Sequence, residues 1–213
     1  MWRMTALGVV LLAGCPAGDD DPSGDGGVVT TGLVLTWAVV PSVPGPVRAD
    51  VTVQELHIAY SSVRSLGDAA PGDARTSRGR TDLEWEDGRR PPPIEFDQAP
   101  PGLYSALELG VGGGDEGFSV HGEVDLAGTW TPFEIEDEAA NPVALDLAVD
   151  LRPGMVATVP LEIDLASVLA AVPFADLPRT GGHLELGRDD PRMRPVRAAL
   201  AAAVHVAGAG LTR

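Results

Sequence analysis

The chain has 213 residues, of which 31 are acidic and 15 are basic, so its formal net charge is −16 at pH 7. Such an acidic surface repels the phosphates of nucleic acids, which argues against a nucleic-acid partner. Only one cysteine is present, so no intramolecular disulfide can form and the fold must be held by its apolar core.

The first 14 residues have the pattern of a cleaved export signal. Arg3 and the terminal amine precede an apolar run over residues 4–12. A run of about nine residues is too short to span a bilayer as a helix, and its length suits the core of a signal peptide. The sequence therefore predicts an exported protein.

The segment that follows, Leu12-Ala13-Gly14-Cys15, resembles the lipobox of bacterial lipoproteins. The resemblance implies cleavage between Gly14 and Cys15, and a diacylglyceryl group on the Cys15 thiol that anchors the chain to a membrane. An ordinary signal peptide with a chance cysteine is the alternative. The lipobox is favoured because the chain's one cysteine stands where lipidation requires it.

Residues 15–27 form the expected tether between the lipid and the folded domain. Pro16 is not the aspartate that retains some lipoproteins at the inner membrane, which favours the outer membrane, on either its periplasmic or its surface face. The segment has no large apolar side chain, so a flexible acidic linker is expected. Its aspartate triplet lacks the spaced ligands of a calcium loop.

Residues 28–213 are expected to form one mainly β domain. Alternating apolar residues predict a first strand at 28–40 and a second through Val51, Val53, Leu56 and Ile58. The alternation changes phase between Val53 and Leu56, which predicts a β-bulge or a strand break there. Residues 67–93 are expected to be a long loop.

Further strands are predicted by the same alternation at 103–111, 118–126, 129–136, 143–151 and 156–163. In the first of them, Leu103 and Leu107 are expected to face the core and Tyr104 the opposite side. Short strands joined by Gly/Pro turns are typical of an antiparallel β-sandwich or a barrel, and the sandwich is favoured.

Two helices are expected near the C-terminus. The first covers residues 165–172 and ends before Pro173. The second begins at Asp189 or Asp190 and ends at Gly208, with an apolar stripe that packs on the sheet. Together with the turn Pro101-Gly102-Leu103-Tyr104, this order of features is similar to that of uncharacterised bacterial lipoproteins with a transthyretin-like β-sandwich. That resemblance implies a fold and no particular activity.

The sequence contains none of the common catalytic or metal-binding motifs. Two carboxylate pairs share a strand face, Asp146 with Asp150 and Glu134 with Glu136, as expected of a solvent-exposed acidic sheet. The histidines lack the close spacing of metal ligands, so exposed or cross-strand roles are expected for them. These histidines are His57, His121, His183 and His205. No enzyme, metal or cofactor is therefore predicted.

The leading hypothesis is a non-catalytic envelope lipoprotein that presents its domain to a protein or glycan partner. The second is a small-ligand or carbohydrate-binding lipoprotein that uses Trp85, Trp130 or Tyr104 as stacking surfaces. Trp85 could instead be a plug that pins its loop to the sheet, and the plug is favoured. Two tryptophans around one cleft would strengthen the second hypothesis. An envelope hydrolase is the third.

Overall fold

The computed structural model describes residues 30–68, 74–87, 89–114 and 117–212. The predicted signal peptide, Gly14, Cys15 and the tether at 15–27 lie outside these residues. The described part of the chain consists of two β-sheets and two α-helices, one of them near the C-terminus. This confirms the predicted mainly β sandwich with C-terminal helices.

The smaller sheet has five strands and the order β14-β11-β1-β6, with β15 also paired to β11. Its central strands, β1 and β11, run parallel, which differs from the antiparallel pairing expected, whereas the other pairs are antiparallel. The strands are β1 (Gly32–Val40), β6 (Ile94–Phe96), β11 (Val156–Asp164), β14 (Val204–Val206) and β15 (Gly210–Thr212).

The larger sheet has ten strands and the order β10-β7-β3-β8-β9-β13-β12, with β2, β4 and β5 on the other edge of β3. Its strands are β2 (Gly45–Arg48), β3 (Val51–Gly67), β4 (Ala74–Arg78), β5 (Thr81–Trp85), β7 (Gly102–Val111), β8 (Phe118–Asp125), β9 (Trp130–Asp137), β10 (Asn141–Leu151), β12 (Arg179–Thr180) and β13 (His183–Leu186). All of its pairs are antiparallel except β13 with β9.

β3 spans both halves of the larger sheet because it is 17 residues long. β8 pairs with its first half and β7 with its second, along the same edge. At the junction, the Ala59 N–H donates to the Gly117 carbonyl (2.7 Å) and the Ala59 carbonyl accepts from the Gly112 N–H (2.9 Å). One residue of β3 thus holds both ends of the β7–β8 connection.

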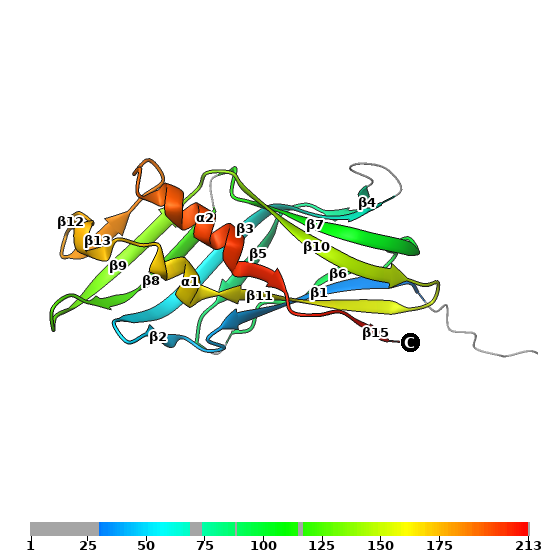
Figure 1. Cartoon of the computed structure of the whole chain (residues 1–213), viewed down its shortest axis with the longest axis horizontal. Coiled ribbons are helices and arrows are strands. Elements are labelled where there is room, and N and C mark those ends of the chain that lie inside the picture. The colour runs from blue at the N-terminus through cyan, green and yellow to red at the C-terminus, as the bar shows by residue number, and fades with distance from the viewer. Residues whose placement is uncertain (1–29, 69–73, 88, 115–116, 213) are drawn as a thin grey trace, which may run out of the picture.

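Different layers cover the two halves of this long sheet (Figure 1). In one half, β10 and β7 lie over β11 and β1 and form the sandwich. In the other, α1 (Leu165–Ala170), α2 (Met193–Ala203) and the 3-10 turn η1 (Phe174–Asp176) cover the inner face. There the ring centroids of Phe174 and Phe133 are 4.9 Å apart. The buried apolar residues of both halves form one continuous core.

The predicted phase change after Val53 is confirmed, because the β3–β8 register shifts between Val53 and Glu55. The expected faces of β7 were wrong at its start: Tyr104 is buried and Leu103 is exposed. The reason is a β-bulge at Ser105. Ala106 pairs with Leu66 and Tyr104 pairs with Gly67, so Ser105 has no partner residue on β3.

Three other features differ from the prediction. The expected loop at 67–93 contains β4 and β5, which pair with β3. The second helix begins at Met193 rather than at Asp189 or Asp190. It ends at Ala203 rather than Gly208, because Val204–Val206 pairs with β11 as β14. The short strand β13 was not predicted, and it adds an edge to β9. Among the described residues no helix is long and apolar enough to cross a membrane.

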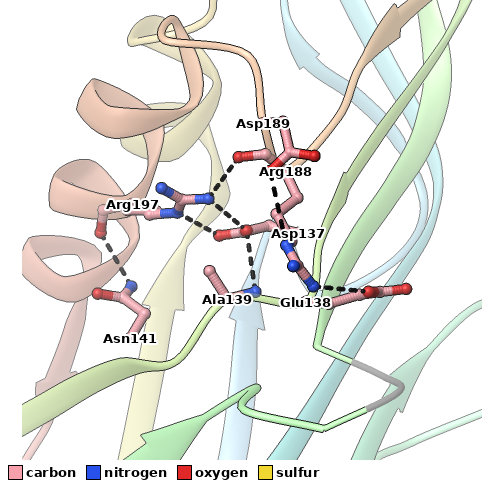
Figure 2. A network of polar contacts seen from close by, with 7 residues as sticks. All are labelled: Asp137, Glu138, Ala139, Asn141, Arg188, Asp189 and Arg197. Atoms are coloured by element: carbon pink, nitrogen blue, oxygen red, sulfur yellow. Dashed lines mark hydrogen bonds and ion pairs between the residues drawn. The ribbon is translucent and has the colours of Figure 1, made fainter.

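A polar network ties α2 to the connection between β9 and β10 (Figure 2). Arg197 on α2 donates to both carboxylate oxygens of Asp137, and it also donates to the Arg188 carbonyl. The Asn141 amide donates to the Arg197 carbonyl at 3.2 Å. Nearby, Arg188 pairs with Glu138 at 3.2 Å. The network fixes the helical layer on the sheet.

Candidate functional site

A pocket of about 430 Å³ opens between the two sheets, and two tryptophans line it. Trp37 comes from β1 in the smaller sheet, and Trp85 comes from the end of β5 in the larger one. The remaining walls are apolar on one side, with Val39, Val43 and Pro44, and largely charged on the other, with Glu86, Arg89, Arg90 and Pro91. Pockets that hold small molecules have this size and this lining.

The aromatic wall of the pocket is continuous with the core. The Trp37 ring stacks on Tyr60 of β3, with centroids 5.0 Å apart and ring planes at 14°. Trp85 sits opposite Leu56 in the β3–β5 register and is only 2% exposed. Because both tryptophans are held by core neighbours, the pocket is preorganised for an apolar or ring-shaped ligand.

Two arginines lie at the polar rim of the pocket, and they differ in whether an acidic side chain already compensates their charge. Arg89 pairs with Glu84 at 2.6 Å and with Glu86 at 2.8 Å, so its charge is compensated. Arg90 is exposed and forms no ion pair with any residue in the part of the chain that the structure describes. An anionic group on a ligand would therefore find a partner at Arg90.

The three aromatic residues singled out in the sequence lie in different environments. Trp85 lines the pocket, but it is also as deeply buried as expected of a residue that pins its segment to the sheet. Trp130 is 49% exposed at the start of β9 and does not line this pocket. Tyr104 is fully buried, and its hydroxyl donates to the Pro100 carbonyl at 2.7 Å, so it is closed to a ligand in this conformation.

Sequence reasoning missed Trp37 as a pocket residue. Its strand was predicted, and its alternation with Leu33 and Leu35 gave no indication of a pocket. Only the parallel pairing of β1 with β11, and the packing of the two sheets, place it opposite Trp85. No local pattern in the sequence carries that information.

Carboxylates lie beside all four histidines, with ring-nitrogen-to-oxygen distances of 2.8–3.7 Å. The pairs are His57 with Asp82, His121 with Glu134, His183 with Glu185 and His205 with Glu162. Glu134 additionally lies 3.7 Å from His183. Glu134 thus joins two histidines that are far apart in the sequence, which spacing alone could not reveal.

The carboxylate pairs noted in the sequence differ in their surroundings. Asp146 and Asp150 are exposed on the outer face of β10. Glu134 and Glu136 lie beside His121 on β9, and partial burial, followed by the charge of Glu134, raises the pKa of Glu136. Of the two carboxylate pairs, only Glu134 and Glu136 lie close to a histidine ring nitrogen.

No protein-family model, curated protein or solved structure matches this chain. The lipid anchor implied by the lipobox-like segment therefore remains a prediction. The relationship to transthyretin-like lipoproteins implied by the order of features also remains a prediction.

Proposed function

We propose that this protein is a lipid-anchored, non-catalytic binding module of the bacterial cell envelope, and that it holds a small amphipathic ligand in the Trp37–Trp85 pocket. The observation that carries the proposal is the convergence of two tryptophans, from opposite sheets, on one open pocket. The half-buried Trp37 ring offers the surface on which rings of sugars or aromatic compounds can stack, and the buried Trp85 backs the pocket wall.

The chemistry of the rim supports a ligand with an anionic group. Arg90 is exposed beside the apolar walls, and its guanidinium can bind a carboxylate or sulfonate through two parallel hydrogen bonds. A ligand with an apolar ring and a negative charge would satisfy both features of the pocket. The acidic surface elsewhere on the chain would disfavour anionic molecules that lack the ring.

The lipobox-like segment supports the anchor. A lipid on Cys15 followed by the acidic tether would hold the domain near a membrane while leaving the pocket free to collect ligand. Two or three acyl chains would make this attachment effectively permanent, because each buried methylene contributes about 0.8 kcal/mol.

The pocket can be tested with 8-anilinonaphthalene-1-sulfonate, a fluorescent probe that combines aromatic rings with a sulfonate. We expect saturable binding of one probe per chain, and at least a tenfold higher Kd in Trp37→Ala and in Val43→Glu. Val43 is 65% exposed at the pocket, so its change adds a repelling charge without disturbing the core. Trp130→Ala is the matched control, since it removes an exposed tryptophan outside the pocket.

Binding that is equally strong in Val43→Glu and in the wild type would reject the pocket as the site. If the probe is displaced by uronic-acid oligosaccharides, the ligand is an acidic glycan; displacement by aromatic carboxylates alone would identify a non-sugar metabolite. Loss of binding in Trp130→Ala as well would mean that the probe reports general surface apolarity.

The anchor is tested by fractionation of cells that express the wild type or Cys15→Ala. We expect the wild type in the membrane fraction and the variant released or unprocessed. Protease added to intact cells then distinguishes a surface domain, which is cleaved, from a periplasmic one, which is protected. Equal, soluble behaviour of both proteins would reject the lipid anchor.

A further inference from the structure

Side chains from neighbouring strands form a row of acids and imidazoles on the outer face of the larger sheet. The cross-strand register places His121 of β8 opposite Glu134 of β9, and Glu134 opposite Glu185 of β13. The residues that alternate with them along these strands, such as Val120 and Ile135, are buried in the core. The row is therefore a fixed consequence of strand pairing.

Three ligand atoms of this row converge. One atom each from His121, Glu134 and Glu136 lie within 4.8 Å of one another. Within this group, His121 Nε2 and Glu134 Oε1 are 3.5 Å apart. Two ligands of a tetrahedral zinc ion, each about 2.0–2.1 Å from the metal, lie roughly 3.3 Å from one another. The pair needs almost no movement to hold a metal between them.

The imidazole of His121 provides an independent indication. Its Nε2 atom is buried from solvent and makes no hydrogen bond to any described residue. A ring nitrogen in this state forgoes its contact with water and gains no hydrogen bond in exchange. The lone pair of a neutral imidazole nitrogen is also the ligand that zinc and similar ions prefer.

A cation would also relieve repulsion within the row. Glu134 and Glu136 are two residues apart on one strand, so their carboxylates point to the same face, and Glu185 adds a third acid. Among the described residues, Glu134 and Glu185 form ion-pair contacts only with His121 and His183, and no arginine pairs with them. A bound divalent cation would therefore offset negative charge that no arginine compensates.

From this geometry we propose that His121, Glu134 and Glu136 bind a divalent transition-metal ion, zinc in the first instance. His183 lies beside this group, with its Nε2 3.7 Å from Glu134 Oε2 and 2.8 Å from Glu185 Oε1. A pocket of about 370 Å³, lined by both histidines, Glu134 and the turn Gly181-Gly182, leaves room for a metal-bound water or a ligand group. This site is separate from the Trp37–Trp85 pocket and does not depend on it.

Another histidine–glutamate pair in the chain provides a matched control. His205 of β14 faces Glu162 of β11 at 3.5 Å, the same distance as His121 from Glu134. The described residues place no further histidine or acid close enough to complete a three-ligand group there. If pairing with one carboxylate were enough to bind zinc, both histidines would contribute equally.

The experiment is a calorimetric titration of the full chain, freed of metal with a chelator, with Zn²⁺ alone. We expect one ion per chain, at least a tenfold higher Kd in His121→Ala and in Glu134→Gln, and no change in His205→Ala. Glu136→Gln, at an exposed position, keeps the test valid if the first two variants fold poorly. A zinc affinity that is unchanged by His121→Ala and Glu136→Gln, or no binding at all, would overturn the proposal.

Co²⁺ provides a second readout that surface adsorption does not give. Bound in a tetrahedral site with imidazole and carboxylate ligands, it should develop visible absorption bands that saturate at one equivalent. These bands should be lost in His121→Ala and retained in His205→Ala. Bands that persist in His121→Ala would place the ion elsewhere and reject the site.

Discussion

Arg197 on α2 donates hydrogen bonds from two nitrogens to the two carboxylate oxygens of Asp137 on β9, both at 2.7 Å. Asp137 is only 4% exposed, and its Oδ1 atom also accepts from the Ala139 N–H at 3.1 Å. A buried carboxylate needs such partners, because desolvation of an unpaired charge is costly. This pair connects the last long helix to the sheet across 60 residues of sequence (Figure 2).

Removal of the arginine should strongly destabilise the fold. Arg197→Met leaves Asp137 buried without its charge partner, so we expect the free energy of unfolding to fall by about 3 kcal/mol in urea denaturation. The control is Arg64→Met, which breaks the exposed pair with Glu108 (3.0 Å) and should cost less than about 1 kcal/mol. Equal effects of the two changes would show that the Asp137 pair contributes no more than a surface ion pair.

Gly122 of β8 should not tolerate a side chain. A Cβ atom there would lie 2.2 Å from the Thr52 carbonyl oxygen and 2.8 Å from the Phe133 ring, so Gly122→Ala must push two strands apart. We expect a loss of about 1–3 kcal/mol in the free energy of unfolding. Gly79→Ala, where nothing lies within 4 Å of the added carbon, is the control and should be nearly neutral. Thermal unfolding that is unchanged in Gly122→Ala would contradict this packing.

The sequence predicted the parts of the fold that depend on local alternation. The strand at 143–151 was recognised because Val143 to Leu151 alternate with outward residues, and β10 has that burial pattern. The bulge in β3 was recognised from the phase change after Val53. β13 was missed because its four residues are too few for a pattern, and it is stabilised by contacts with residues distant in the sequence, above all by its pairing with β9.

The candidate sites were less predictable than the strands, because they depend on contacts between distant residues. Trp37 and Trp85 face one pocket only because their two sheets pack together. His121 and His183 both lie beside Glu134 because β8, β9 and β13 pair with one another in that order. A parallel strand pair such as β9–β13 is not joined by a tight turn, so no turn motif in the sequence predicts it. Spacing along the chain is therefore a poor guide to metal ligands on a sheet.

Replacement of Tyr60 by phenylalanine should stabilise the fold. Its hydroxyl is buried without a hydrogen-bond partner among the described residues, whereas its ring stacks on Trp37. Tyr60→Phe keeps the ring and removes the unsatisfied group, so we expect a gain of about 1 kcal/mol in the free energy of unfolding at pH 7. A loss of stability in this variant would show that the hydroxyl has a partner, such as a bound water.

The same residue should make the wild type sensitive to alkali. Burial raises the pKa of Tyr60 well above its usual value of 10.0. The unfolded chain releases the proton near pH 10 while the folded chain keeps it, so stability is fully present below pH 10 and falls as the pH rises further. Denaturation series at pH 8 and pH 11 should show a larger loss in the wild type than in Tyr60→Phe. Parallel losses in both proteins would mean that Tyr60 ionises freely in the folded state.

Asp164 should stabilise the start of α1, and this stabilisation should be lost at low pH. Its carboxylate accepts from the Ser167 hydroxyl and from the Ser167 N–H (3.3 Å), and these bonds, the hydroxyl first, lower the pKa of Asp164 below 3.8. The stabilisation is therefore present above pH 3.8 and is lost as the pH falls through the lower folded value. Asp164→Ala should reduce the free energy of unfolding by about 1 kcal/mol at pH 7 and by much less near pH 2, as measured by urea denaturation. Asp146→Ala, at an exposed position of β10, should have little effect at either pH. A cost of Asp164→Ala that is the same at both pH values would show that the helix end is held by packing and not by the carboxylate.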